Sequence, residues 1–275
     1  MTRRFAGRRA VITGASRGIG AALARRLAAE GADVVVAART LESHDHLAGS
    51  LNQTLQTMSH FGGRYVPIVV DLVDTHDRQR LIPEAEAALG GPIDILVNNA
   101  AAAMYALPST YSAKRRHITF EANVFAPHDL AMAAIPSMRE RGEGWIVNVS
   151  SASKHTPPGP PYPTTGMGPL IGVYGASKAA LDRLTQALAH ELHGSGIRVN
   201  TIEPRAAVMS EGAEALVGGV VNAQQVESME GMVESMLHVC DCPADFTGRV
   251  CVSLDLLDEL KLTVRSLDGG PLTTG

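Results

Sequence analysis

Seven short runs of apolar, mostly β-branched residues alternate along this chain with longer stretches rich in alanine and leucine. The runs are Ala10–Thr13, Asp33–Ala38, Tyr65–Val70, Ile93–Val97, Trp145–Val149, Ile197–Ile202 and Arg249–Ser253. Short strands that alternate with helix-length segments are typical of βαβ units in a parallel sheet, and nearly all-apolar strands indicate a sheet covered on both faces. The pattern predicts a doubly wound α/β fold, with a seven-stranded parallel sheet and helices on both faces.

Two intervening stretches have the period of an amphipathic helix. Ile19–Glu30 places Leu23 and Leu27 on one face, and Ala176–His193 carries leucines at spacings of three and four residues. We expect both helices to pack on the sheet. No repeat of solenoid length and no linker divides the chain, so a single domain is predicted over residues 1–275.

Two segments interrupt the alternation. Lys154–Gly172 contains five clustered prolines, which exclude a helix or a central strand and predict a surface loop. Glu211–Val239 is helical sequence with methionines and glycines, placed before the last strand. Open α/β sheets often carry a mobile cover over their ligand crevice there. A substrate lid is therefore predicted around residues 205–240.

Composition excludes several classes of partner. The 24 basic and 28 acidic residues and a pI near 6.2 provide no general electrostatic footprint for nucleic acid. No apolar stretch is long enough to cross a membrane and no apolar leader precedes the first strand, so a cytoplasmic protein without membrane contact is expected. Three cysteines cannot build a disulfide framework, and their Cys-x-Cys spacing lacks a fourth ligand, so no metal site is assigned.

The first strand runs directly into a glycine-rich turn that opens a helix. The turn reads Thr13-Gly14-Ala15-Ser16-Arg17-Gly18-Ile19-Gly20. Glycines let the backbone approach a pyrophosphate closely, and the helix N-terminus favours negative charge. A turn with this spacing between a strand and an amphipathic helix predicts dinucleotide binding. The chain is thus expected to be a single NAD(P)-binding domain of the Rossmann type.

The end of the second strand indicates which dinucleotide is bound. NAD sites usually place a carboxylate there for the adenosine ribose, but this chain has Ala38 followed by Arg39. A guanidinium suits a 2′-phosphate, so NADP is favoured over NAD. Arg17, inside the glycine turn, is a candidate second cation.

With these motifs the chain resembles the classical short-chain dehydrogenase/reductase family from about Arg8 to Ser253. Asp71-Leu72 resembles the adenine-contacting position of that family, and Asn98-Asn99-Ala100 resembles its cofactor-side loop. The resemblance also places Pro204 on the cofactor side of the sheet. Two departures are present: Glu203-Pro204-Arg205 replaces the usual Pro-Gly, and alanine replaces glycine after Asn98-Asn99-Ala100.

The catalytic centre is expected at Tyr174-Gly175-Ala176-Ser177-Lys178. Positions i and i+4 share a helix face, so Tyr174 and Lys178 can act at one site. Lowering a tyrosine pKa from about 10 to about 7 requires roughly 4 kcal/mol. A positive charge about 4 Å away supplies about 4 kcal/mol at an effective dielectric constant near 20. The spacing therefore predicts that Lys178 lowers the pKa of Tyr174, and the resemblance implies that it also binds the nicotinamide ribose.

A serine is expected to orient the substrate carbonyl from the end of the fifth strand. The resemblance favours Ser151, with Ser150 as the alternative, because consecutive strand residues face opposite sides. Ser151 and Tyr174 are 23 residues apart, where the family often has thirteen, so the proline-rich loop resembles an insertion of about ten residues. Asn123 resembles the asparagine that sustains the proton relay of the family.

These features predict an NADP-dependent oxidoreductase that transfers a hydride between the nicotinamide and a carbonyl or secondary alcohol. The sequence does not indicate whether reduction or oxidation is the physiological direction. The alternative is a catalytically weak NADP-binding regulatory or scaffold protein of the same fold. An extended-type epimerase or dehydratase fits the glycine spacing less well. Arg205 either recognises an acidic substrate or faces solvent. The resemblance implies a homotetramer or homodimer packed through Phe120–Arg139 and Ala176–His193.

Overall fold

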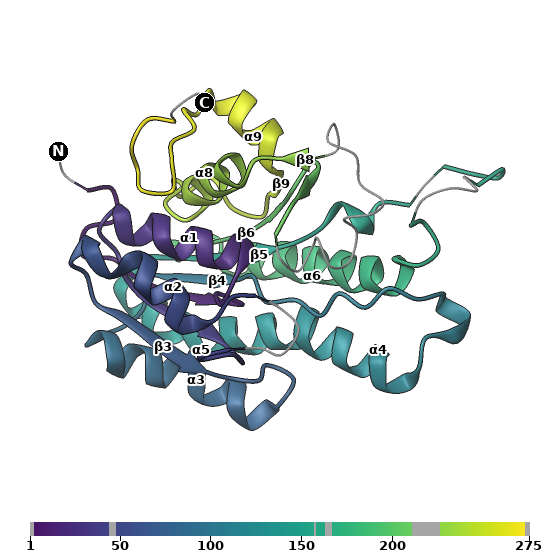
Figure 1. The fold of residues 1–275 in the computed structure, drawn as a ribbon, viewed down its shortest axis with the longest axis horizontal. Helices are drawn as coiled ribbons and strands as arrows, with labels where there is room; N and C mark the ends of the chain where they lie inside the picture. The colour runs from purple at the N-terminus through teal and green to yellow at the C-terminus, as the bar shows by residue number, and fades with distance from the viewer. Residues whose placement is uncertain (1–2, 44–47, 157, 163–166, 211–225, 273–275) are drawn as a thin grey trace.

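The computed structural model describes residues 3–43, 48–156, 158–162, 167–210 and 226–272. Its centre is a seven-stranded sheet whose strands all run parallel, in the order β3-β2-β1-β4-β5-β6-β9 (Figure 1). The strands are β1 (Arg9–Thr13), β2 (Asp33–Ala38), β3 (Tyr65–Val69), β4 (Ile95–Asn98), β5 (Gly144–Val149), β6 (Ile197–Glu203) and β9 (Val250–Val252). The order reverses at β1 and β4, which is the switch point where doubly wound folds bind ligands.

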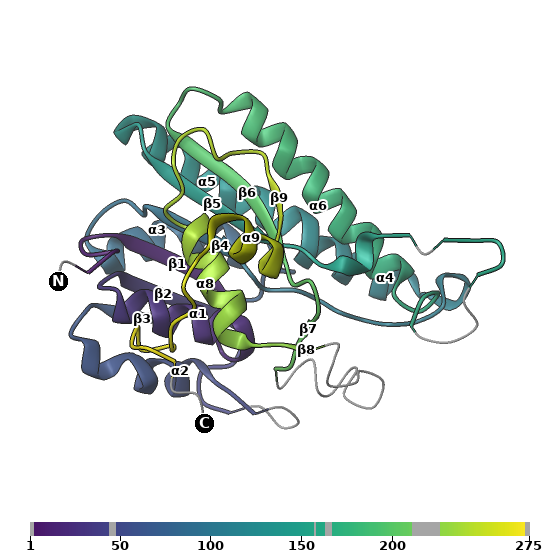
Figure 2. The same cartoon turned by 90° about the horizontal axis from the view of Figure 1, so that it is seen from above.

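Helices cover both faces of this sheet, as the all-apolar strands predict. One layer contains α1 (Gly18–Ala29), α2 (Leu51–Met58), α8 (Met229–Val239) and α9 (Ser253–Leu260), and the other contains α3 (Thr75–Leu89), α5 (Ala126–Arg141) and α6 (Gly172–Glu191) (Figures 1 and 2). Alternate strand residues face alternate layers: Ile12 belongs to the core cluster of α1, and Val11 belongs to the core cluster of α3 and α5. The predicted doubly wound architecture is confirmed.

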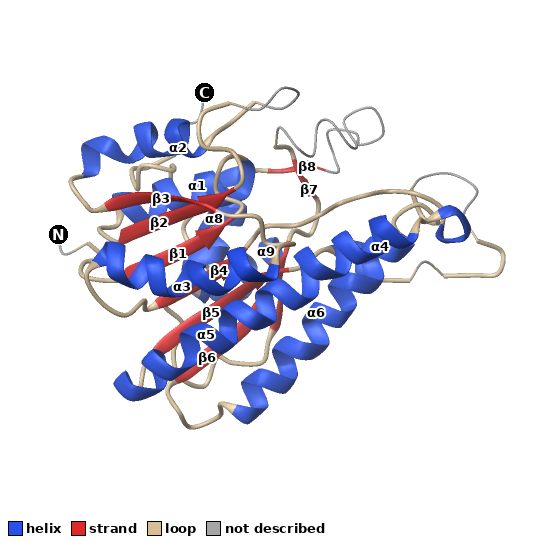
Figure 3. Ribbon diagram, turned by 90° about the horizontal axis from the view of Figure 1, so that it is seen from below, coloured by secondary structure: helices blue, strands red, loops and turns tan. Residues whose placement is uncertain are grey.

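Two further features complete the fold. Helix α4 (Ala113–Phe120) lies beside α6 (Figure 3) and continues through a π-helical turn, Glu121–Phe125, into α5. A separate two-stranded parallel sheet pairs β7 (Ala207–Val208) with β8 (Val226–Glu227). None of the described helices is both long enough and apolar enough to cross a bilayer.

The segment predicted as a lid is described only in part, because residues 211–225 lie outside the described residues. From Met229 onward the chain forms α8, whose Met232, Val233 and Met236 side chains are completely buried against the layer that contains α1. The methionines of α8 thus belong to the hydrophobic core, and the lid around residues 205–240 stays a prediction.

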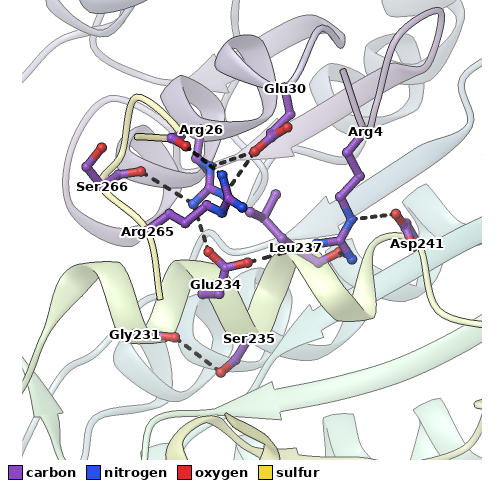
Figure 4. A network of polar contacts seen from close by, with 11 residues as sticks. Arg4, Arg26, Glu30, Gly231, Glu234, Ser235, Leu237, Asp241, Arg265 and Ser266 are labelled. Atoms are coloured by element: carbon purple, nitrogen blue, oxygen red, sulfur yellow. Dashed lines mark hydrogen bonds and ion pairs between the residues drawn. The ribbon is translucent and has the colours of Figure 1, made fainter. Parts of the chain in front are cut away.

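Buried ion pairs hold α8 to α1 and to the C-terminal segment (Figure 4). The Arg26 guanidinium, 2% exposed, donates to Glu234 at 2.9 Å, to Glu30 at 2.9 Å and to the backbone oxygen of Ser266 at 3.4 Å. A buried guanidinium is tolerated only where its donors are satisfied. Arg26 therefore fixes three segments that are distant in sequence.

The proline-rich segment follows a 3₁₀ turn, η4 (Ala152–Lys154), that leaves β5. Its described residues from 158 to 162 are exposed, as predicted for a surface loop. The beginning of the segment differs, because the Lys154 side chain is only 8% exposed.

Candidate active site

The glycine turn lies at the switch point, between β1 and α1. Arg17 precedes α1 without capping it, and the first turn of α1 contains no acidic residue. The N-terminus of α1 therefore keeps the polarity that favours an anion. A cavity of about 500 Å³ opens beside this turn, lined by Ser16, Arg17 and Gly18 among others.

Asn99 fixes the shape of the turn, a role that the sequence analysis did not assign to it. Its Nδ2 donates to the backbone oxygens of Thr13 at 2.9 Å and Gly14 at 3.2 Å. The Thr13 hydroxyl accepts in return from the N–H groups of Asn99 and Ala100. Gly14 has a φ of +66°, and a Cβ there would lie 2.7 Å from the Cα of Ala100, so a side chain at Gly14 would separate the two loops.

Asn98, the neighbouring candidate, has its side chain inside the protein. It is 2% exposed, and its Nδ2 donates to Asn148 on the adjacent strand at 2.8 Å. Consecutive strand residues point to opposite sides of a sheet, so the sequence itself indicates that the side chains of Asn98 and Asn99 point in different directions. Any cofactor contact of Asn98 would involve its backbone and stays a prediction, as does that of Ala100.

The two candidate cations differ in their surroundings. Arg17 donates through Nε to the backbone oxygen of Ala48 at 2.6 Å and through Nη2 to that of Gly49 at 3.0 Å. Arg39 is exposed at the end of β2 and forms no ion pair with any residue that the structure describes. The Arg39 guanidinium is therefore the more available of the two for a ligand.

Asp71 shapes the turn after β3. Its Oδ1 accepts from the N–H of Val73 at 3.0 Å, and its own N–H donates to Asp77 at 2.9 Å. Leu72, next to it, is 8% exposed. These contacts are those of an Asx turn, and the adenine contact of Asp71 and Leu72 stays a prediction.

Helix α6 brings Tyr174 and Lys178 together. Tyr174 lies in its first turn and Lys178 one turn later, with the ammonium 5.8 Å from the centre of the tyrosine ring. Lys178 is 2% exposed, and its Nζ donates to the backbone oxygen of Val149 at 2.7 Å. The lysine thus ties α6 to the end of β5.

Ser151 is the serine that reaches Tyr174. Its side chain lies near enough to the phenol to lower the pKa of Tyr174. Ser150 is 4% exposed, and its hydroxyl has no partner among the described residues. The contact is possible despite the long insertion because Gly175 lets α6 lie against η4: a Cβ on Gly175 would be 2.1 Å from the Ser153 oxygen.

The pKa of Tyr174 differs from the expectation. Burial raises it well above the usual value, charge repulsion from Tyr105, whose ring centre lies 5.7 Å away, raises it further, and Ser151 only partly opposes this. Burial also lowers the pKa of Lys178 to about 8, against the attraction of the Asp182 carboxylate. Desolvation thus dominates the pKa of Tyr174 in this structure, and the lowering of that pKa by Lys178 stays a prediction.

Asn123 lies in the π-helical turn and is completely buried. Its Oδ1 accepts from the N–H of Ala102 at 2.7 Å, and its Nδ2 donates to the hydroxyl of Ser177 at 3.0 Å. Ser177 in turn donates to the backbone oxygen of Tyr174 at 2.6 Å. Asn123 is thus linked to the helix turn that carries Tyr174, and its proton-relay role stays a prediction.

The departure from the family pattern at Arg205 has a structural explanation. Arg205, after the half-buried Pro204, forms an ion pair with Asp255 at 2.7 Å, and its N–H donates to Glu227 at 3.2 Å. Its guanidinium is thus directed to α9, which argues against recognition of an acidic substrate.

The three cysteine thiols are free and buried, and the described residues contain no cluster suited to a metal ion.

Comparisons with known proteins agree with this geometry. A family profile for short chain dehydrogenases matches residues 8–216. The mouse hydroxysteroid dehydrogenase-like protein 2 is 31% identical over 268 residues, which are 94% of this chain and 50% of the mouse protein. The chain thus spans about half the length of that relative. Ketoacyl reductase HetN from a Nostoc species is 34% identical over 198 residues, which cover 72% of this chain and 63% of HetN.

A solved structure shows the same fold with a bound nucleotide. The 3-oxoacyl (acyl-carrier-protein) reductase from Agrobacterium tumefaciens, crystallised with NADP, aligns with a TM-score of 0.77 and 27% identity over 91% of this chain and 94% of its own. The family profile and the shared fold thus point to one group of proteins. The chain belongs to the short chain dehydrogenase family.

Proposed function

We propose that this protein is an NADP-dependent oxidoreductase that transfers a hydride between the nicotinamide and a carbonyl or secondary alcohol. One observation carries the proposal: Ser151, Tyr174 and Lys178 meet at the carboxyl end of the sheet although a long loop separates Ser151 from the others. A phenol, a hydroxyl and an ammonium at such a site are the groups that a carbonyl reduction requires.

Each of these residues has a distinct role in the proposed reaction. NADPH, when bound at the glycine turn, would be the source of the hydride. Tyr174 gives its proton to the carbonyl oxygen, and its raised pKa keeps that proton in place at neutral pH. Ser151 donates a hydrogen bond to the same oxygen. The Lys178 ammonium stabilises the phenolate that is left. Alcohol oxidation follows the reverse path.

The nucleotide site fits NADP in this proposal. The uncapped N-terminus of α1 suits the pyrophosphate. Arg39, exposed and without an acidic partner among the described residues, suits the 2′-phosphate. The NADP bound to the Agrobacterium reductase supports this choice.

A carbonyl panel with NADPH tests the activity. It begins with 3-oxoacyl thioesters and ketosteroids, because two of the relatives are named for oxoacyl or ketoacyl substrates and one for hydroxysteroids. Loss of nicotinamide absorbance with at least one carbonyl is the expected result. Tight NADPH binding without turnover of any carbonyl would instead support the scaffold protein.

Assembly into a homo-oligomer is part of the proposal. Exposed apolar side chains lie on the helices that the family resemblance assigns to subunit contacts: Phe125 before α5 is 48% exposed, Met132 on α5 is 39% exposed and Leu184 on α6 is 38% exposed. Burial of such side chains favours association. Light scattering after gel filtration should give a dimer or tetramer, and a monomeric mass would contradict this part.

A further inference from the structure

Lys154 lies between two buried carboxylates next to the candidate active site. Its side chain is 8% exposed, and its Nζ contacts Asp182 on α6 and lies 2.6 Å from Glu203 at the end of β6. The Glu203 side chain is 2% exposed, and on its other side the exposed His155 ring approaches it at 3.0 Å. One ammonium thus holds the turn after Ser151 to both a helix and a strand.

Buried carboxylates are costly without a partner of opposite charge. Asp182 and Glu203 share Lys154 as their common partner. Three charged side chains buried together beside the candidate site require a reason beyond the fold.

The reason follows from the position of Asp182. It lies four residues after Lys178, so it shares a face of α6 with the lysine, and its carboxylate attracts the Lys178 proton. Whatever charge remains on Asp182 after its contact with Lys154 acts on Lys178. Lys154 thereby controls how much of the Asp182 charge reaches the site.

We propose that Lys154 is a positioning residue of the active site: it neutralises Asp182 and Glu203, and so sets the charge around Lys178 and Tyr174 while it anchors the turn that carries Ser151. The inference rests on the proposed function. The titratable groups around this site come from four parts of the chain: Tyr174 and Asp182 on α6, Lys154 and His155 at the end of η4, Glu203 on β6, and Tyr105 beside Tyr174.

The charge on Lys178 can be measured without turnover. The chain has only four lysines, Lys114, Lys154, Lys178 and Lys261, so lysine enriched with an NMR-active carbon isotope at Cε gives a simple spectrum. The Lys178 signal is assigned with Lys178→Arg. In the wild type we expect it to titrate near its lowered pKa of about 8.

Two substitutions should shift this titration in opposite directions. Lys154→Met leaves Asp182 uncompensated and should raise the pKa of Lys178 by about one pH unit. Asp182→Asn removes the attraction and should lower it. Asp182→Asn leaves Lys154 paired with Glu203, so it carries the test even if Lys154→Met does not fold. Lys154→Arg keeps the charge and should restore the wild-type titration.

Glu234→Gln is the matched control, because it disrupts the buried ion pair with Arg26 between α1 and α8 (Figure 4). It should lower stability without moving the Lys178 titration. An unchanged Lys178 titration in both Lys154→Met and Asp182→Asn would overturn the proposal.

Turnover gives a second, separate readout. If a carbonyl is reduced, the alkaline limb of the pH profile should move upward in Lys154→Met and return with Lys154→Arg, and an unmoved limb would count against the proposal. If no carbonyl is reduced but the lysine titration shifts as expected, the proposed function fails while the electrostatic role of Lys154 stands.

Discussion

Lys178 donates a hydrogen bond of 2.7 Å to the backbone oxygen of Val149, the last residue of β5. The contact joins the helix that carries Tyr174 to the strand that leads into Ser151. The same ammonium is buried, so its protonation has a free-energy cost that depends on pH.

That cost predicts how stability changes with pH. The pKa of Lys178 is about 8 in the folded protein, against 10.5 for an ordinary lysine. Between these values the unfolded chain binds the proton and the folded one does not, so stability rises with pH. From pH 8 to 10 the wild type should gain about 2 kcal/mol relative to Lys178→Met. Urea unfolding of both proteins checks this, and parallel pH curves would contradict it.

The hydrogen bonds between Asn99 and the glycine turn give a second prediction. Asn99→Ala removes the two hydrogen bonds to the Thr13 and Gly14 oxygens. We expect a loss of about 1–3 kcal/mol in stability, together with weaker NADPH binding, because the turn is no longer held to the loop after β4. Asn52→Ala, at an exposed position on α2, is the control. Unaltered NADPH affinity in Asn99→Ala would contradict this prediction, because the turn would then keep its shape without the Asn99 hydrogen bonds.

The Arg39 side chain is expected to determine the preference for NADPH over NADH. Replacement by aspartate should reverse the preference from NADPH to NADH, because a carboxylate repels the 2′-phosphate and accepts from the ribose hydroxyl instead. Calorimetry with both nucleotides measures this. Arg183→Asp makes the same charge change at an exposed site on α6 and should leave the preference intact. Equal affinities of the wild type for NADH and NADPH would refute the role of Arg39.

The sequence was sufficient for the sheet and for the order of the motifs. Strands buried on both faces are nearly continuous apolar runs. The turn before α1 requires glycines, and these are identified directly in the sequence. For helix α8 the sequence was not sufficient, because an apolar helix has the same composition whether it covers a ligand or enters the core.

Side-chain partners were harder to predict, since they depend on contacts between distant segments. Nothing in the sequence near Tyr174 indicates Tyr105, which arrives from the loop after β4, and Lys154 looked like the start of a solvent-exposed loop. The raised pKa of Tyr174 was hard to predict for the same reason. Lys178 is close to Tyr174 in the sequence, whereas the burial that raises the pKa depends on the whole fold.

The most direct test of the proposed chemistry is to compare Tyr174→Phe with the wild type in NADPH-dependent reduction of a carbonyl that the wild type accepts. Phenylalanine keeps the ring and removes only the proton donor. We expect kcat/KM to fall at least about 100-fold while the NADPH dissociation constant stays unchanged. A Tyr174→Phe enzyme that reduces the carbonyl at the wild-type rate would contradict the assignment of Tyr174 as the proton donor.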